Sequence, residues 1–403
     1  MTLHWITLQM CSTLGVRNRN GPRARHPRPR TPPPGQQPGG AARPALPPDP
    51  GSRRLDRREE QKSVAHISVG VLGTGSYLPK EEVGNEDLAA RVGVDPEWII
   101  RKTLIRNRRF AAPDEATSDL AAKASVAALA QAGTNAADID YLIVTTSTGD
   151  HPLPPTSYLV QDLLGAHRAA CFDINVTCSS FVYALALARG LLLTRPEARV
   201  LIASADLYSR SLDFSNRRTA ILLGDGVGAA VVGAVPDRYG VIDFELRSRG
   251  DAHRLIRIEA GGTRSPITHD AITSGDHLFR MEGRAVREFV IDEVPPAVAT
   301  LLSRTGTAPQ EVRHFIPHQP NGVLLTDLDQ RLGLPNARLH RTYTDFGNLG
   351  SASVPVTLDR ANRAGDLADG DLLLLAGFGG GMSIGACLLR WAAPHAPAGE
   401  VGR

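Results

Sequence analysis

The chain has 403 residues, 42% apolar and 22% charged, which is typical of a soluble globular protein of two domains or one large duplicated domain. Its apolar runs are too short for a membrane span, and its four cysteines form no CxxC motif or Cys/His cluster, which excludes a disulfide scaffold and a zinc site. The net charge of +3 divides into +8 over residues 1–65 and −5 over the remainder, so the folded part is not expected to bind nucleic acid. We expect a protein of the reducing cytoplasm.

Residues 1–65 contain eleven arginines and eleven of the 29 prolines, with little apolar periodicity. Such a segment cannot bury enough surface to offset its ordering entropy. We therefore predict a disordered tail here, or an extension added by an upstream start site.

From Ser68 the pattern changes to alternating strands and helices. An apolar strand runs into a glycine-rich turn, and the order helix, strand, strand-to-helix turn, helix, strand follows. The expected elements of this first half are the strand 68–79, the helix 118–133, the strands 140–147 and 172–175, the helix 179–193 and the strand 198–206. The second helix is apolar all round, as expected of a helix enclosed between two sheets.

The same pattern recurs at an offset of 173 residues. Residues 129–144 match residues 302–317, including Gly133 with Gly306, and Asn175 falls on Asn348. A third match, residues 226–232 with 383–389, needs an offset of 157. The repeat predicts an α/β protein of two halves related by a pseudo-twofold axis, each with a mixed, mostly parallel sheet, in five layers. We place the halves at residues 66–236 and 237–392, followed by a flexible C-terminus at 393–403.

Cys178 lies where a short strand meets the apolar helix. The first N–H groups of a helix are unpaired and carry partial positive charge, which favours a thiolate and predicts a nucleophile. The alternative is a small buried apolar residue. Cys171 and Cys387 lie in strand-like runs and are interpreted as core residues.

The second half supplies three further features. His318 directly follows a predicted strand, and Asn348 occupies the turn before a helix, as Asn175 does before Cys178. The loop at residues 377–381 offers backbone N–H groups that can stabilise an oxyanion. Alternatively, the histidine is structural, the asparagine is a helix cap and the loop is a tight hairpin. The pseudo-twofold axis brings these loops toward one site.

In this combination the chain from about 67 to 391 resembles β-ketoacyl-acyl-carrier-protein synthase III, a family of thiolase-like condensing enzymes. The motifs that carry the resemblance are GTGSYLP (73–79), EWIIRKTLIRNRR (97–109), DINVTCSSF (173–181), LLGDGVGAAVV (222–232), DHLFRMEGRAVREF (276–289), IPHQPN (316–321), DFGNLGSASVP (345–355) and GFGGG (377–381). The resemblance implies a five-layer αβαβα fold and a homodimer.

The resemblance also implies roles for single residues. Cys178 takes an acyl group from acyl-CoA, and His318 and Asn348 stabilise the enolate formed when a malonyl thioester loses carbon dioxide. The N–H groups of Cys178 and Gly380 form the oxyanion hole. The remaining implied contacts are with coenzyme A and its pantetheine arm: Trp98, Lys102, Arg217 and Asn321. Leu153 is implied to reach across the dimer and cap the acyl pocket of the partner, which makes it a candidate for specificity. No metal and no permanently bound cofactor are implied.

Several positions depart from the family pattern. Leu104 replaces a usual glycine, and Val323 stands where an arginine commonly docks the acyl carrier protein. Ser179 and Ser180 follow the cysteine where alanine and glycine are typical. These departures suit a specialised relative that selects a starter unit for a polyketide or another secondary metabolite.

Three functions are left open by the sequence. The first is decarboxylative condensation of an acyl-cysteine with a malonyl thioester carried on an acyl carrier protein or on coenzyme A. The second is transfer of the acyl group to a hydroxyl or amine, and the third is a non-catalytic partner subunit of a synthase. Asn348 beside His318 favours condensation, because simple transfer needs a base rather than a pair of enolate donors.

Overall fold

The computed structural model describes residues 67–393. The predicted N-terminal tail lies outside the described residues, as does all but the first residue of the predicted flexible C-terminus.

Two five-stranded sheets form the framework, and their strand orders match. The first sheet, in the order β1-β7-β6-β4-β5, consists of β1 (Ser68–Tyr77), β7 (Asp225–Val235), β6 (Val200–Leu207), β4 (Tyr141–Thr145) and β5 (Ala170–Ile174). The second, in the order β8-β14-β13-β11-β12, consists of β8 (Gly240–Ser248), β14 (Ser383–Arg390), β13 (Leu372–Gly379), β11 (His314–Pro317) and β12 (Arg338–Leu339). The three strands at one edge of each sheet are parallel, and the other pairs are antiparallel. The predicted mixed sheets and thiolase-like fold are confirmed.

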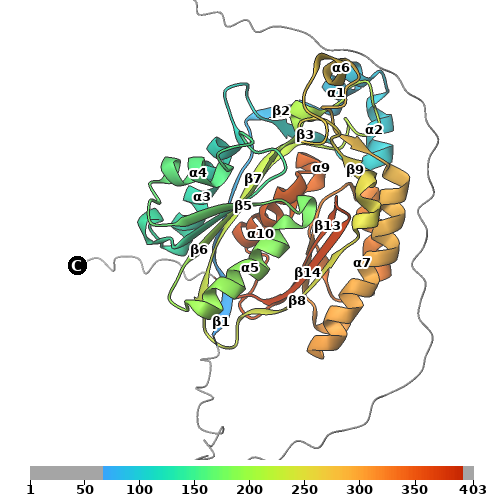
Figure 1. Cartoon of the computed structure of the whole chain (residues 1–403). Coiled ribbons are helices and arrows are strands. Elements are labelled where there is room, and N and C mark those ends of the chain that lie inside the picture. The colour runs from blue at the N-terminus through green and yellow to red at the C-terminus, as the bar shows by residue number, and fades with distance from the viewer. Residues whose placement is uncertain (1–66, 394–403) are drawn as a thin grey trace, which may run out of the picture. The chain divides into compact units, whose positions relative to one another are not determined.

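Helices fill the three other layers (Figure 1). Helices α5 (Ser180–Thr194) and α10 (Ser353–Arg363) contact strands of both sheets and form the central layer. The outer face of the first sheet carries α3 (Thr117–Ala132) and α4 (Thr156–Leu164). The outer face of the second carries α7 (Gly283–Thr305), with α8 (Gly322–Leu332) packed beside it.

The repeat is visible in how equivalent helices end. Helix α3 ends at Gly133 with φ 57°, and α7 ends at Gly306 with φ 64°. Only glycine adopts this left-handed conformation without strain, so glycine ends both helices. In both halves the following threonine N–H bonds back to a leucine carbonyl of the last turn.

The other elements gather mainly at one end of the two sheets (Figure 1). They are β2 (Glu81–Gly84), α1 (Asn85–Val92), α2 (Pro96–Thr103), β3 (Asn107–Phe110), β9 (Ile256–Arg257), α6 (His269–Thr273), β10 (Arg280–Met281) and α9 (Tyr343–Phe346). Short 3₁₀ turns connect elements: η1 (Ala136–Asp138), η2 (Thr177–Ser179), η3 (Tyr208–Ser211), η4 (Gly250–Leu255), η5 (Pro309–Glu311) and η6 (Gly350–Ala352).

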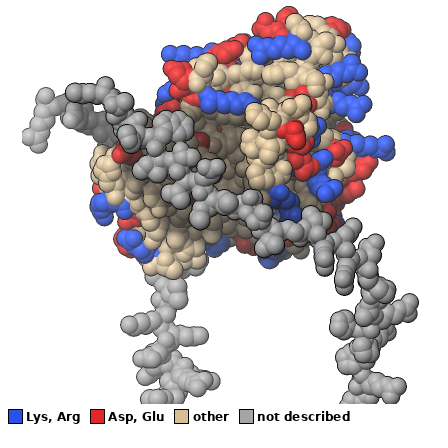
Figure 2. Space-filling view, turned by 45° about the horizontal axis from the view of Figure 1, so that its top comes forward, with Lys and Arg blue, Asp and Glu red and all other residues tan. Residues whose placement is uncertain are grey.

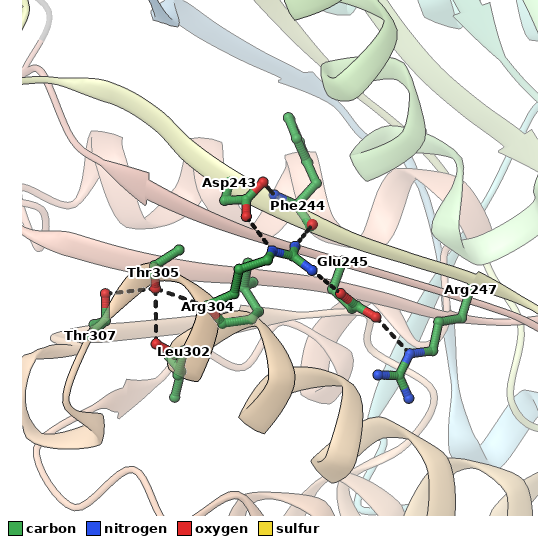
Figure 3. Close-up of polar contacts among 9 residues, drawn as sticks. Asp243, Phe244, Glu245, Arg247, Leu302, Arg304, Thr305 and Thr307 are labelled. Atoms are coloured by element: carbon green, nitrogen blue, oxygen red, sulfur yellow. Dashed lines mark hydrogen bonds and ion pairs between the residues drawn. The ribbon is translucent and has the colours of Figure 1, made fainter.

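An arginine fastens the outer helix α7 to the second sheet (Figure 3). Arg304 Nε donates to Asp243 Oδ2 at 2.6 Å, and its Nη1 donates to Glu245 Oε2 at 2.7 Å. The third nitrogen donates to the carbonyl of Phe244. Both carboxylates lie on β8, so one guanidinium fixes the end of the helix against this edge strand.

The apolar helix α5 is less enclosed than the sequence predicted. It packs between the sheets, but Leu187 is 48% exposed and Leu193 is 45% exposed. The prediction of a helix buried all round is therefore wrong for one face. The segment Thr177–Thr194 is long and apolar enough to cross a membrane, and its place between two sheets explains that composition without one.

Candidate active site

The three residues predicted to act together line one pocket. Cys178 lies in η2, directly before α5, and His318 follows the last residue of β11. Asn348 precedes η6 and α10. The first half thus provides the thiol, and the second half provides the imidazole and the carboxamide.

A strained turn presents Cys178. The preceding Thr177 has φ 45°, a conformation that costs a β-branched residue free energy and that persists only where the surroundings impose it. Asn175 Oδ1 accepts from the Thr177 N–H at 3.1 Å, and Thr177 Oγ1 donates to the Gly380 carbonyl at 2.7 Å. These bonds hold the turn against the glycine loop.

The glycine loop approaches the thiol closely. It forms the turn between β13 and β14, so it is also the hairpin that the sequence left as the alternative. A Cβ atom at Gly379 would lie 2.9 Å from Cys178 Sγ, which is too close for any side chain. The backbone N–H groups of Gly380 and Cys178 both act on the sulfur. This is the pair of donors that the sequence predicts for an oxyanion hole.

The resting thiol is neutral. Burial raises the pKa of Cys178 to about 12, the charge of Asp206 acts in the same direction, and the N–H groups of Gly380 and Cys178 oppose them. The expectation that the helix N-terminus favours the thiolate is wrong for the resting protein, because desolvation outweighs the backbone donors. Cys178 must lose its proton as it attacks.

His318 is a neutral imidazole in an apolar setting. It is 3% exposed, and its ring meets the edge of the Phe378 ring with the centroids 5.5 Å apart. Burial lowers the pKa of His318 to about 3, opposed by the backbone of Gly350. Its buried Nδ1 has no hydrogen-bond partner among the described residues. At neutral pH the ring therefore carries one N–H and no charge.

Asn348 is fixed by its backbone and by one side-chain atom. Its N–H donates to the Leu222 carbonyl at 2.8 Å, and its carbonyl accepts from the Gly224 N–H at 3.0 Å. Its Oδ1 accepts from the Gly350 N–H at 2.9 Å. The side-chain NH₂ group then remains as the donor available to the pocket, which Asn348 lines.

The rest of the pocket is almost entirely apolar, and its volume is about 40 Å³. The sequence analysis did not identify its walls, which contain Tyr208, Leu222, Leu223, Ile256, Phe279, Met281, Val286, Val290, Leu324 and Phe378. Only Leu222, Leu223, Phe279, Met281, Val286 and Phe378 lie within motifs quoted above. Apolar residues at scattered positions carry no distinguishing signal in a single sequence.

Asp206 is a second residue that the sequence analysis missed. It is the penultimate residue of the buried strand β6 and is fully buried. Its carboxylate accepts from the N–H groups of Ser147 at 2.8 Å and Ser351 at 2.7 Å. A charged residue at the end of an otherwise apolar strand is the signal that could have identified it.

Two of the residues predicted to contact coenzyme A lie against each other. The guanidinium of Arg217 lies 5.5 Å from the centroid of the Trp98 ring. Trp98 is half-buried on α2, whereas Arg217 is exposed. Lys102, also on α2, is exposed, and no contact joins it to either residue.

The other two predicted substrate contacts lie outside the pocket. Asn321 caps α8, where its Oδ1 accepts from the Leu324 N–H at 3.0 Å. Leu153 is 82% exposed in the loop before α4. Cys387 is buried, as predicted, but Cys171 is half-buried, because β5 is the edge strand of the first sheet. Among residues 67–393, no group of three or more His, Cys, Asp or Glu is arranged to hold a metal ion.

Two family models match the chain. The model for 3-oxoacyl-[acyl-carrier-protein] synthase III matches residues 172–250, and the model for the C-terminal part of that enzyme matches residues 302–391. The first match includes Cys178, and the second includes His318, Asn348 and Gly380.

Curated proteins and solved structures agree with these matches. The acetoacetyl CoA synthase NphT7 of Streptomyces sp. strain CL190 is 45% identical over 81% of this chain and 99% of its own length. The β-ketoacyl-[acyl-carrier-protein] synthase III of Caldanaerobacter subterraneus is 39% identical over 81% of this chain and 98% of its own. The crystal structure of the priming β-ketosynthase from the R1128 polyketide biosynthetic pathway superposes with a TM-score of 0.76 at 32% identity, covering 81% of this chain and 97% of that one.

Proposed function

The chain belongs to the 3-oxoacyl-[acyl-carrier-protein] synthase III family of thiolase-like condensing enzymes, and from this premise we propose that it condenses a short acyl group with a malonyl thioester. In this proposal Cys178 carries the acyl group, and the product is a β-ketoacyl thioester. The observation that carries it is that Cys178, His318 and Asn348 line one narrow apolar pocket.

The first half-reaction loads the enzyme. Cys178 sulfur attacks the thioester carbonyl of an acyl-CoA, its proton leaves with the coenzyme A thiol, and an S-acyl cysteine remains. The carbonyl oxygen becomes negative in the tetrahedral intermediate, where the N–H groups of Cys178 and Gly380 stabilise it. Because the resting thiol is neutral, this proton transfer accompanies attack.

The second half-reaction forms the carbon–carbon bond. The bond from the malonyl carboxylate to its α-carbon breaks, carbon dioxide leaves, and the electron pair enters an enolate. The N–H of neutral His318 and the side-chain NH₂ of Asn348 donate to the enolate oxygen. The α-carbon then attacks the acyl carbonyl, and the Cys178 thiolate leaves and is reprotonated. A neutral imidazole suits this role, because a donor rather than a base is needed.

The pocket size favours a short acyl donor. A volume of about 40 Å³ holds roughly three groups the size of water, at about 10–15 Å³ each. That admits an acetyl or propionyl group. The similarity to an acetoacetyl CoA synthase supports the same choice, with acetyl-CoA as donor and coenzyme A as a carrier of the malonyl group.

A second candidate setting is starter-unit priming in secondary metabolism. It is favoured by the similarity to a priming β-ketosynthase and by Val323, which stands at the usual carrier-docking arginine and is 39% exposed on α8. An acidic carrier protein binds basic surface, and the one face that Figure 2 shows is not uniformly basic, because acidic and basic side chains mix on it. We therefore propose that the malonyl group is carried on coenzyme A rather than on an acyl carrier protein.

We also propose a cytoplasmic homodimer. The exposed apolar side chains Leu153, Tyr158 and Leu163 lie on or beside α4, and the neighbouring strand β5 is an unpaired sheet edge. Apolar side chains beside an unpaired edge favour pairing with a second copy. Light scattering of the purified full chain would give twice the mass of one chain if this is correct.

The test of the function is purified protein incubated with acetyl-CoA and malonyl-CoA. We expect carbon dioxide release, acetoacetyl-CoA formation and a mass increase of one acetyl group that is lost in Cys178→Ala but kept in Cys171→Ala. An ester or amide product without carbon dioxide would instead favour acyl transfer. No adduct with any acyl thioester would favour a non-catalytic subunit.

A further inference from the structure

One tyrosine lines the pocket beside Cys178. Tyr208 is the first residue of η3, at the end of β6, and only 5% of its surface is exposed. It lines the same pocket as Cys178, His318 and Asn348. No motif quoted from the sequence contains it.

The Tyr208 hydroxyl is anchored on the side of the first half. It lies 2.8 Å from Ser147 Oγ, and Ser147 Oγ in turn donates to Asp206 Oδ1 at 3.1 Å. The Ser147 N–H also donates to Asp206, at 2.8 Å. Because Asp206 is fully buried and accepts further from the Ser351 N–H, this chain of hydrogen bonds is tied to both halves of the protein.

The Tyr208 ring is held as firmly as its hydroxyl. It meets the Phe279 ring edge-on, with the centroids 5.5 Å apart and the planes at 71°. The main chain beside it is fixed as well: the Leu207 N–H donates to Thr148 Oγ1 at 2.8 Å, and Ser211 Oγ donates to the Tyr208 carbonyl at 3.1 Å. An aromatic ring held at its edge and at its hydroxyl cannot turn aside for a longer ligand without breaking these contacts.

The remaining walls are more adaptable. Apart from Tyr208, Phe279 and Phe378, the apolar lining consists of a proline, aliphatic side chains and one methionine, and the unbranched methionine is the one that adapts most readily to a longer ligand. Leu153, which the resemblance places in the acyl pocket of the partner subunit, does not line the pocket of its own chain. We propose that Tyr208, braced by Ser147, Asp206 and Phe279, is the specificity-determining residue that limits the acyl donor to about the size of an acetyl or propionyl group. This inference rests on the proposed function.

The test measures which acyl groups load onto Cys178. Acetyl-, butyryl-, hexanoyl- and octanoyl-CoA are each incubated with the protein, and the adduct is followed by intact mass and by coenzyme A release. In the unmodified protein we expect kcat/KM for loading to fall by at least about tenfold for each step beyond acetyl, within the range for misfitting methylenes. Equal loading of acetyl and octanoyl groups would overturn the proposal without any variant.

Three variants test whether Tyr208 sets the limit on acyl chain length. In Tyr208→Ala we expect the ratio of hexanoyl to acetyl kcat/KM to rise by at least about 100-fold, since two steps of about tenfold separate acetyl from hexanoyl and the removed ring leaves room for the longer chain. Tyr208→Phe keeps the ring and its contact with Phe279 but loses the bond to Ser147, so we expect the same ratio to rise by no more than about tenfold. Tyr239→Ala removes a half-exposed tyrosine that does not line the pocket and should change nothing.

The outcomes separate this inference from the function itself. If Tyr208→Ala keeps the original chain-length profile, or if only Leu153→Ala widens it, the proposal is wrong. Should Tyr208→Ala fail to fold, as judged by its thermal transition, Tyr208→Leu provides the same comparison with a smaller loss of volume. If the unmodified protein forms no adduct with any acyl-CoA, the proposed function fails instead.

Discussion

Thr177 and Gly350, 173 residues apart, share the same left-handed backbone conformation, with φ 45° and 56°, at the first residue of two equivalent 3₁₀ turns. Each follows, by two positions, an asparagine whose Oδ1 accepts its N–H, at 3.1 Å from Thr177 and 2.9 Å from Gly350. The pseudo-twofold repeat therefore extends to single hydrogen bonds at the active site. One copy of the turn presents the thiol, and the other positions the groups that face it.

Gly350→Ala should destabilise the protein strongly. A Cβ atom there would lie 2.4 Å from Asp206 Oδ2, in addition to the cost of a left-handed backbone. Together we expect a loss of about 2–5 kcal/mol in the free energy of unfolding, measured by urea denaturation. Gly365→Ala is the matched control, because Gly365 has φ 70° and nothing within 4 Å of its added Cβ. Equal losses in the two variants would show that the contact with Asp206 is unimportant.

Much of the fold was predictable from the sequence, because the repeat determines it. Gly133 and Gly306 mark the ends of equivalent helices, and the matching apolar runs become equivalent strands in two sheets of the same order. The exposed face of α5 was not predictable. An apolar helix has the same sequence pattern whether its last face meets a sheet of its own chain or is left uncovered.

At the active site, the sequence motifs identified the reactive side chains but did not predict how deeply they are buried or which residues surround them. Cys178, His318 and Asn348 each stand at the end of a recognisable element, so the topology brings them together. Their pKa values depend on how completely neighbouring loops exclude water, which involves contacts distant in sequence. The wall formed by Tyr208 was missed for the same reason, since its partners Ser147 and Phe279 come from separate loops.

His318→Ala and Asn348→Ala should separate the two half-reactions. Both residues are proposed to donate to the enolate oxygen, whereas loading uses the N–H groups of Cys178 and Gly380. We expect carbon dioxide release to fall by about 10²–10³-fold in each variant, with acetyl loading on Cys178 reduced less than tenfold. Loading is measured by intact mass and decarboxylation by labelled carbon dioxide. A parallel loss of both half-reactions would contradict this division of roles.

Trp98→Ala and Arg217→Ala should weaken coenzyme A binding without slowing chemistry. The stacked pair lies outside the acyl pocket, so its contacts are the same in the ground and transition states. We expect KM for acetyl-CoA to rise by about tenfold, as for loss of a base-stacking contact, with kcat unchanged. Lys102→Ala, which alters an exposed cation on the same helix, tests whether charge alone has the same effect. A fall in kcat in Trp98→Ala would place the ring nearer to the reacting atoms.

The stability of the protein should depend on pH through Asp206. Burial raises the pKa of Asp206 to about 6, opposed by the N–H groups of Ser147 and Ser351, against an ordinary value of 3.8. The folded state thus favours the protonated carboxyl, and the stabilisation it provides below pH 4 is lost as pH rises through about 6. Relative to Asp206→Asn, the unmodified protein should lose about 2 kcal/mol of unfolding free energy between pH 4 and pH 7. Urea denaturation across this range measures the difference, and a constant difference would contradict the shift.

The same carboxylate should restrain the nucleophile. Above about pH 6 Asp206 is ionised, and its negative charge acts with burial to raise the pKa of Cys178. Asp206→Asn removes this charge, so the thiolate fraction of Cys178 at any pH between 7 and 9 should increase. We expect alkylation of Cys178 by iodoacetamide, followed by peptide mass, to accelerate by at least about threefold.

Asp225→Asn is the control for this effect. Asp225 is also fully buried, accepts from the N–H groups of Ser209 and Ala111, and does not act on the Cys178 thiol. Its substitution disturbs a buried hydrogen-bonded carboxylate of the same kind without altering the charge near the sulfur. Cys178 should therefore alkylate at the unmodified rate in this variant. If both variants accelerate alkylation equally, the cause is loosened packing rather than the charge of Asp206, because only loosening is common to the two substitutions.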